Sequence, residues 1–246
     1  MSTPPSLHHT TNILTSFYWS GDAIRSRNVS DVVITGTVDV PALPARLIAD
    51  WEREISLRLE LEPGDVETLP LARARIRWPD YSRSVKAVSD WMRELGLQDL
   101  LAESSVALMA CRGAKYHHDG EHYGGAAFCN LFLSEDKGLD LHFPSASHRI
   151  PLVKGTVVIF DTGQPHAVIP RSSNGFNVTD FPPDLDCSQV FLTWEFPIED
   201  THILNALQVA FDTDPSAALK LNEEQVWLNG ARGKVSSDSG LWFRAD

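Results

Sequence analysis

The spacing of hydrophobic residues divides the chain into a helical first part and a β-rich second part. Residues 41–60 carry apolar side chains at helical spacing, and residues 82–97 repeat that pattern. Residues 31–40 are rich in β-branched side chains, which are typical of a strand. Residues 1–20 are rich in Ser, Thr and Pro, so we expect a poorly ordered lead-in. The first hundred residues therefore predict mostly helices with one or two strands.

From about residue 105 the pattern changes to short β-like runs separated by Gly, Pro, Asp and Ser. These runs are residues 105–113, 126–134, 138–144, 148–153, 155–161, 166–171 and 188–196. Many short strands with turn residues between them favour an antiparallel sandwich or barrel. A helix over 201–211 and a hairpin over 225–243 are expected to follow. We therefore predict an α+β chain with a mainly β core, a jelly roll with N-terminal helices packed on one sheet.

Composition narrows the class of protein. The 246 residues are 43% hydrophobic and 22% charged, which is ordinary for a globular chain. The three cysteines have no CxxC spacing, and no signal peptide or membrane-spanning run is evident, so we expect a cytoplasmic protein without a membrane partner. A formal net charge of −12 disfavours a nucleic-acid partner, because such affinity comes largely from clustered Lys and Arg.

A metal site is indicated by three residues of the β-rich part. His117 and Asp119 are two residues apart, so in extended backbone both side chains leave the same face. His166 is the best third candidate because it follows a buried-looking strand and a Gly/Pro turn and opens the next strand. Two His and one Asp leave adjacent coordination positions open, the arrangement associated with non-haem Fe(II) oxygenases.

Residues 112–170 as a block resemble the Fe(II)/2-oxoglutarate-dependent oxygenases. That family has a double-stranded β-helix with an HxD pair after an early strand and a distal His about fifty residues later. Here His166 lies 47 residues after Asp119, and a Gly-x-x-Tyr entry, an NLFLS strand, an LxLHFP strand and a GTVVIFD strand occur in order. The resemblance covers roughly residues 105–196.

The resemblance implies a dioxygenase that uses Fe(II), 2-oxoglutarate and O2 to hydroxylate or desaturate a small-molecule metabolite, releasing succinate and CO2. From the residue pattern we expect one catalytic domain over residues 1–246, with a helical layer at 1–104, a jelly-roll core at 105–198 and a C-terminal extension at 199–246. A homodimer is one option.

The family often carries a Lys or Arg about ten residues beyond the distal His, where it pairs with the far carboxylate of 2-oxoglutarate. This sequence has no basic residue there. Arg171 is the nearest, and its guanidinium suits a carboxylate, although its strand parity faces away from His166. Arg112 and Arg149 are reserves. Tyr116 and Asn130 are further candidates for cosubstrate contact.

Two other functions remain open from the sequence. The missing basic residue supports a cupin-like metalloenzyme that uses the same triad without 2-oxoglutarate, with Zn as one option for the metal. A non-catalytic binding module with the same barrel is the other, but three retained ligands have no obvious packing purpose. Repair of alkylated nucleic acid is disfavoured by the acidic charge.

Overall fold

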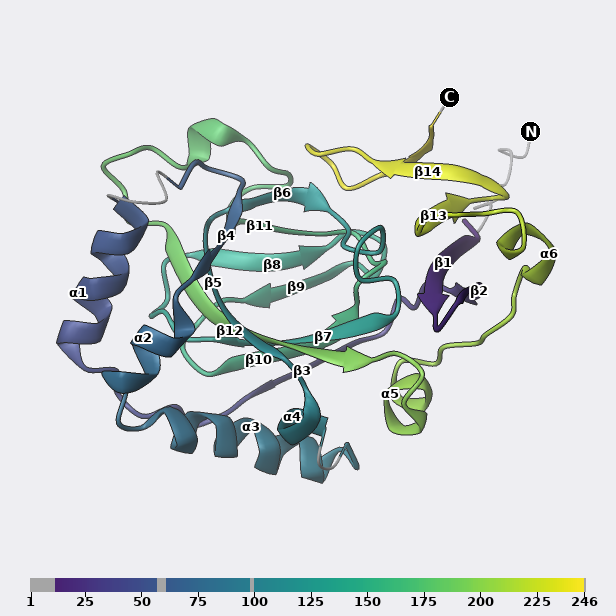
Figure 1. Cartoon of the computed structure of the whole chain (residues 1–246). Coiled ribbons are helices and arrows are strands. Elements are labelled where there is room, and N and C mark those ends of the chain that lie inside the picture. The colour runs from purple at the N-terminus through teal and green to yellow at the C-terminus, as the bar shows by residue number, and fades with distance from the viewer. Residues whose placement is uncertain (1–11, 57–60, 98–99, 246) are drawn as a thin grey trace, which may run out of the picture.

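Antiparallel sheets are the main regular element of the computed structural model, which describes residues 12–56, 61–97 and 100–245 (Figure 1). One sheet has the order β3 (Val33–Thr37), β10 (Thr156–Asp161), β7 (Ala126–Phe132), β12 (Ser188–Pro197), β5 (Val106–Arg112) and β4 (Val66–Leu69). A second has the order β6 (Ala114–His117), β11 (His166–Pro170), β8 (Leu139–Phe143) and β9 (His148–Pro151). A third has the order β15 (Trp242–Arg244), β14 (Ala231–Val235), β13 (Gln225–Leu228), β1 (Leu14–Ser20) and β2 (Ala23–Asn28).

Strands β5 to β12 form a jelly roll. Strands β5, β7, β10 and β12 lie in the six-stranded sheet, whereas β6, β8, β9 and β11 form the four-stranded sheet. The chain therefore crosses between the two sheets repeatedly, and each sheet pairs strands that are distant in sequence, as in a double-stranded β-helix. This strand order confirms the predicted fold class.

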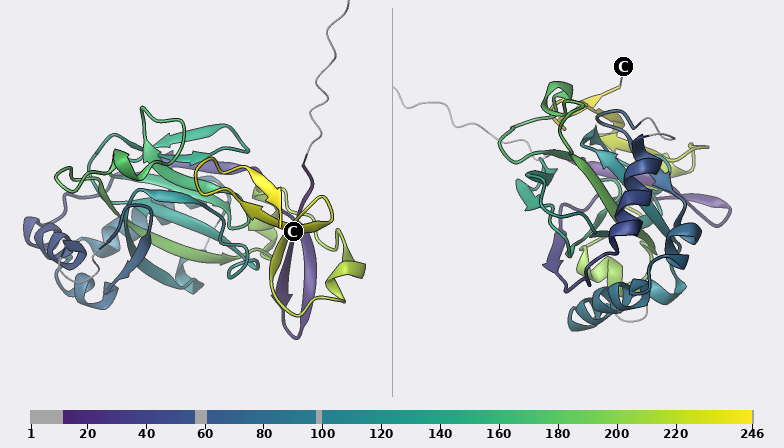
Figure 2. Two further views of the ribbon diagram at one scale, coloured as in Figure 1. Left: turned by 90° about the horizontal axis from the view of Figure 1, so that it is seen from above. Right: turned by 90° about the vertical axis from the view of Figure 1, so that its left-hand side faces the viewer.

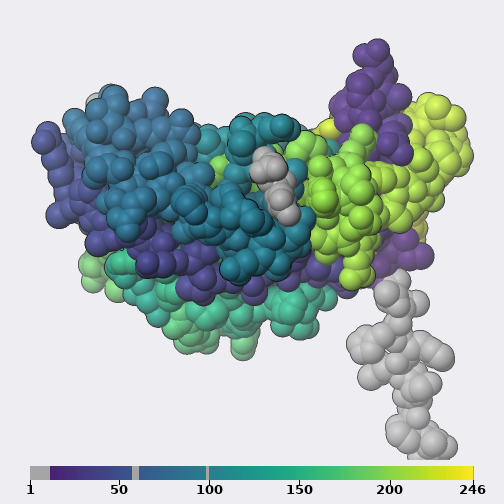
Figure 3. Space-filling model, turned by 90° about the horizontal axis from the view of Figure 1, so that it is seen from below, coloured from purple at the N-terminus to yellow at the C-terminus, as the bar shows by residue number. Residues whose placement is uncertain are grey.

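The helices before the jelly roll cover the outer face of the six-stranded sheet. They are α1 (Ala45–Glu54), α2 (Leu71–Ile76), α3 (Tyr81–Glu94) and α4 (Leu100–Glu103). Their residues, in blue shades, form a continuous layer over the molecule when it is seen from below (Figure 3). This helical layer also agrees with the sequence prediction, although strands β1 to β4 are interspersed with it.

Successive side chains of a strand point to opposite faces of the sheet, and this creates two apolar layers. On β12, Leu192, Trp194 and Phe196 pack with the helices, while Phe191 on the opposite face packs between the two sheets. On β10, Ile159 likewise faces the helices. This period of two is what lets one strand serve both layers. None of the described helices is long and apolar enough to cross a membrane.

A separate sheet closes one end of the molecule, and the sequence did not predict it. Strand β1 pairs with both β2 and β13, so residues near the start of the described chain lie beside residues 225–244 (Figure 2). The expectation of a poorly ordered lead-in over residues 1–20 is thus wrong for residues 14–20, and residues 1–11 lie outside the described part.

The C-terminal prediction is partly confirmed. The predicted hairpin is present, and Asn229 and Gly230 form its two-residue turn with positive φ angles of 51° and 80°. The predicted helix over 201–211 is shorter and is followed by a second short helix. These two are α5 (Thr201–Ala206) and α6 (Pro215–Ala218).

One buried ion pair connects the end sheet to the jelly roll. Arg27 on β2 and Asp161 at the end of β10 have side chains that are 0% exposed, and their two hydrogen bonds measure 2.6 and 2.9 Å. The Asp161 carboxylate also accepts hydrogen bonds from the backbone N–H groups of Ser30 and Gly163. Arg27 Nε donates to the carbonyl oxygen of Gly124 at 2.9 Å. A buried pair with its polar atoms satisfied in this way fixes three chain segments relative to one another.

We predict that Arg27→Met lowers the free energy of unfolding by about 3–5 kcal/mol, because it leaves the Asp161 carboxylate buried and unpaired. Arg25→Met is the matched control. Arg25 lies on the same strand, but its ion pairs with Glu199 and Asp212 are partly exposed, so the loss should be about 0–1 kcal/mol. Urea denaturation of both variants measures the difference. Equal losses in the two variants would contradict this role for Arg27.

Candidate metal centre

Cross-strand pairing brings the two predicted histidine ligands together. His117 ends β6, His166 begins β11, and the two residues are direct partners in the register of these strands. Their ring centroids are 4.4 Å apart. Register shifts immediately afterwards, because Val168 pairs with Ala114 rather than with the residue two positions before His117. This bulge places both Ala114 and His117 on the cavity side.

Asp119 completes the triad from the loop after β6. Its Oδ2 lies 3.6 Å from His166 Nε2, and its Oδ1 lies 3.9 Å from His117 Nε2. One ligand atom from each of the three residues lies within 4.8 Å of the others. The prediction that His117, Asp119 and His166 converge is therefore confirmed, and the cluster is of a size that can hold one metal ion.

Hydrogen bonds to the backbone orient both imidazole rings. His117 Nδ1 contacts the carbonyl oxygen of Lys115 at 2.7 Å, and His166 Nδ1 contacts that of Gln164 at 3.0 Å. A carbonyl oxygen only accepts, so each Nδ1 carries the proton and donates it. The Nε2 lone pairs are then free and point toward Asp119, which is the tautomer that metal ligation requires.

Burial adjusts the protonation of the triad. Burial, reinforced by the neighbouring His117, lowers the pKa of His166 well below its ordinary value. Burial raises the pKa of Asp119, and the nearby His117 opposes that shift. Without a cation, burial of the ionised Asp119 carboxylate costs free energy, and a bound metal ion would offset that cost.

The loop that carries Asp119 is tied to the turn that precedes His166. The Asp119 N–H donates to the carbonyl oxygen of Thr162 at 2.7 Å. The Thr162 hydroxyl contacts the carbonyl oxygens of Tyr123 and Ala126 at 2.6 and 2.9 Å. Thr162 follows Asp161 directly in the chain. The buried ion pair between Asp161 and Arg27 is therefore one residue away from the residue that holds the Asp119 loop.

The triad opens into a cavity of about 260 Å³ between the two sheets of the jelly roll. Asn130 on β7 lines it, is 6% exposed, and has an Oδ1 atom without a hydrogen-bond partner. Thr193, its register partner on β12, has an unpartnered buried hydroxyl in the same wall. Buried polar atoms without partners are unusual and indicate that water or a ligand meets them.

The structure separates Tyr116 from this cavity. Tyr116 is 3% exposed, its hydroxyl contacts His142 Nδ1, and it does not line the cavity wall. The prediction that Tyr116 contacts the cosubstrate is thus not supported, because Tyr116 directly precedes His117 on β6 and its side chain faces the opposite side of the strand.

Arg171 also lies away from the triad, on the outer surface. Its Nε donates to Asp140 at 2.9 Å, its Nη atoms contact Asp136 at 3.1 and 3.3 Å, and it is not part of the cavity wall. The expectation that it anchors 2-oxoglutarate is not supported, because strand parity places it outside and two carboxylates already hold it. The reserves are engaged elsewhere as well. Arg112 donates to the carbonyl oxygens of Phe181 and Pro182, and Arg149 to those of Ser173 and Pro170.

Most residues of the cavity wall were not predicted from the sequence, and Thr193, Glu195 and Tyr123 are among them. A signal for the first two was present, because Phe191, Thr193 and Glu195 alternate with three large apolar residues along a predicted strand. Polar residues on one face of an otherwise apolar strand indicate a lined cavity. No comparable signal marks Tyr123, which lies in the loop after Asp119.

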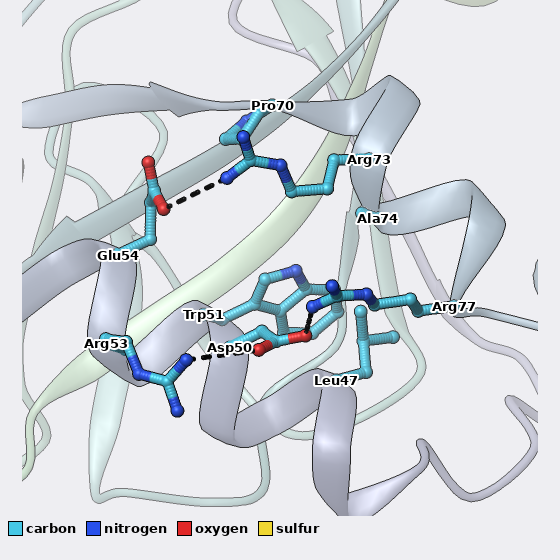
Figure 4. A pocket seen from close by; sticks show the side chains of 9 residues that line it. All are labelled: Leu47, Asp50, Trp51, Arg53, Glu54, Pro70, Arg73, Ala74 and Arg77. Atoms are coloured by element: carbon cyan, nitrogen blue, oxygen red, sulfur yellow. Dashed lines mark hydrogen bonds and ion pairs between the residues drawn. The ribbon is translucent and has the colours of Figure 1, made fainter.

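A second hollow, between α1 and α2, lacks the features of an active site. Figure 4 shows its charged side chains directed toward one another, with Arg53 and Arg77 facing Asp50 and Arg73 facing Glu54. These arginines already have carboxylate partners, and no residue of the triad lines the hollow. The chemistry of this chain therefore concentrates in the jelly roll.

No protein-family model matches the chain, and no curated protein matches it. Among solved structures it is similar to a prolyl-4-hydroxylase from Pseudomonas putida, with 18% identity over 67% of this chain and 91% of that one, at a TM-score of 0.35. It is similar to a viral collagen prolyl hydroxylase from Paramecium bursaria Chlorella virus-1, with 10% identity over 67% and 89%, at a TM-score of 0.40. It is also similar to SnoN, the non-haem alpha-ketoglutarate-dependent epimerase from nogalamycin biosynthesis, with 14% identity over 67% and 78%, at a TM-score of 0.34.

In its own strand order and in its His-x-Asp…His triad, the chain resembles the Fe(II)/2-oxoglutarate-dependent oxygenases. The triad lies where β6 and β11 pair, on the four-stranded sheet, and it faces the cavity.

We predict that His166→Ala weakens Fe(II) binding by at least ~100-fold, because it removes one of three protein ligands. His148→Ala is the control, since His148 is exposed on the edge strand β9 of the four-stranded sheet and belongs neither to the triad nor to the cavity wall. Anaerobic calorimetric titration with Fe(II) gives both constants. Affinity should also fall in acid, as protons compete for the imidazole and carboxylate atoms. Unchanged binding by His166→Ala would show that the metal binds elsewhere.

Proposed function

We propose that this chain is a non-haem Fe(II) dioxygenase that uses 2-oxoglutarate and O2 to oxidise a small molecule. The observation that carries the proposal is the convergence of His117, Asp119 and His166 at the wall of the jelly-roll cavity. Three protein ligands leave coordination positions open on the cavity side, where a 2-oxo acid, O2 and a substrate have room.

The bound metal and cosubstrate would supply the oxidising power, since O2 is reduced while 2-oxoglutarate becomes succinate and CO2. The residues of this chain supply geometry and a dry environment. His117 and His166 offer neutral Nε2 atoms held by backbone carbonyls, and Asp119 offers a carboxylate held by its loop. Phe128 and Phe132 line the cavity with apolar surface, which limits the access of water to the oxidised centre.

The distal carboxylate of 2-oxoglutarate would meet neutral donors in this cavity. Within the described part of the chain, no Lys or Arg belongs to the cavity wall. We propose that the Thr193 hydroxyl and the Asn130 amide take the place of a cation. Both lie in the wall. The buried Thr193 hydroxyl has no partner and can donate, and Asn130 would donate through its Nδ2 amino group, because its Oδ1 atom only accepts. Neutral donors bind a carboxylate less strongly than a guanidinium does, so we expect a modest affinity for 2-oxoglutarate.

The composition of the cavity wall also favours a second candidate function. A cupin-like metalloenzyme that uses the triad without 2-oxoglutarate would need no carboxylate-binding cation, and the described cavity wall contains none. The two candidates differ in one measurable product, because only the first converts 2-oxoglutarate to succinate.

We predict that wild-type protein, titrated anaerobically with Fe(II) and then 2-oxoglutarate, develops the visible charge-transfer band of a chelated 2-oxo acid. Exposure to O2 should then yield succinate. A protein that binds Fe(II) but gives neither band nor succinate would favour the cupin-like candidate.

We predict that Thr193→Val, which keeps the shape of the side chain but removes its hydroxyl, weakens 2-oxoglutarate binding about tenfold to hundredfold. The reason is the loss of a hydrogen bond to a charged group. Arg171→Ala should leave the dissociation constant unchanged, because Arg171 is paired on the outer surface. The charge-transfer band reports both constants. A large effect of Arg171→Ala combined with none of Thr193→Val would reverse the assignment.

A further inference from the structure

Glu195 is a charged side chain in the cavity wall with no evident structural role. It lies on β12, two positions beyond Thr193 on the same face, and it lines the cavity. Its carboxylate has no hydrogen bond or ion pair with any residue in the described ranges of the chain. It also stands outside the metal cluster, which consists of His117, Asp119 and His166.

Strand register places Glu195 at the metal end of the cavity. It pairs with Phe128 near the start of β7, whereas Phe191, at the opposite end of the inward row, pairs with Phe132. Phe128 packs edge-on against Tyr123, with ring centroids 5.1 Å apart, and Tyr123 belongs to the loop that carries Asp119. The carboxylate and the triad thus share one end of the jelly roll.

The surroundings of Glu195 are suited to a positive charge. Phe128 and Tyr123 present aromatic surface in the same wall, and aromatic faces attract cations. Glu195 contributes a negative charge outside the metal cluster, and the described wall contains no Lys or Arg to offset it. A half-buried carboxylate in an apolar cavity is costly unless it is solvated or paired, so a cationic ligand gains from meeting it.

We propose that Glu195 determines substrate specificity and that the substrate carries an organic cation, an ammonium or guanidinium group, bound between Glu195 and the rings of Phe128 and Tyr123. The inference rests on the proposed function in taking this cavity as the substrate site. Glu195 would hold the cation at the metal end and so orient the neighbouring carbon atoms toward the open coordination positions. Anionic substrates would be repelled by the same carboxylate.

Matched aromatic probes test the charge preference without knowledge of the natural substrate. The probes are benzylammonium, benzyltrimethylammonium, benzyl alcohol and benzoate, and the quaternary compound cannot bind a metal ion. Binding to Zn(II)-loaded protein is measured by ligand-observed NMR. Wild-type protein should bind at least one of the two cations about tenfold or more tightly than benzyl alcohol, whereas benzoate shows how far a carboxylate binds through the Zn(II) ion.

Two variants show whether the preference for the cationic probes arises from Glu195. Glu195→Gln keeps the size of the side chain and should remove the preference for the cations. Glu67→Gln should retain the preference, because Glu67 is an exposed residue of β4 whose neighbours Val66 and Thr68, rather than Glu67 itself, line the cavity. Equal binding of all four probes by wild type, no binding of either cation at the highest soluble concentration, or an undiminished preference in Glu195→Gln would each overturn the proposal.

The result of the probe experiment does not depend on the test for succinate formation. A charge preference that depends on Glu195 in a protein that never forms succinate would support the cationic ligand and reject 2-oxoglutarate as cosubstrate. Succinate formation in a protein without any charge preference would support 2-oxoglutarate as the cosubstrate and reject the cationic ligand.

Discussion

The buried pair between Arg27 and Asp161 is the constraint on which the metal site depends. It joins the end sheet to the last residue of β10, and the next residue, Thr162, holds the loop that carries Asp119. Four residues after Thr162 the chain reaches His166, so two of the three residues of the triad are positioned from this one corner. The third, His117, is fixed by strand pairing to His166. A site assembled on paired strands and a buried ion pair is rigid enough to keep its ligands in place before the metal arrives.

Alternating and helical periodicities in the sequence were sufficient to predict the jelly roll and the helical layer, because both elements bury one apolar face. The metal ligands were predictable because HxD spacing and a distal His at a strand start carry geometric meaning. The end sheet was not predictable, since β1 finds its partner β13 some two hundred residues later and nothing local indicates that pairing. Short strand β6 was also missed, because it is four residues long and contains a bulge.

The roles of arginine show where residue type alone is insufficient. Arg171 has the chemistry of a carboxylate anchor, yet Asp136 and Asp140 hold it on the outer surface. Conversely, Arg27 lies in residues 21–30, for which the sequence predicted no element, and it is fully buried. The difference arises from tertiary partners, which pattern reasoning does not see. Strand parity was the one local signal that correctly placed Arg171 outside.

The pairing of β1 with β13 has a consequence for biosynthesis. Residues 225–244 contain strands β13 to β15 of the sheet to which β1 belongs. The Trp242 ring lies at a tilt against His118, with ring centroids 4.8 Å apart. The Tyr116 N–H donates to the carbonyl oxygen of Ser237 at 3.0 Å. The strand that leads into His117 is therefore completed only after the hairpin has left the ribosome. We expect a nascent chain that ends before residue 225 to expose the edge of β1 and to bind chaperones. The backbone before His117 therefore gains its hydrogen bond to residue 237 only after the segments that carry Asp119 and His166 have been synthesised.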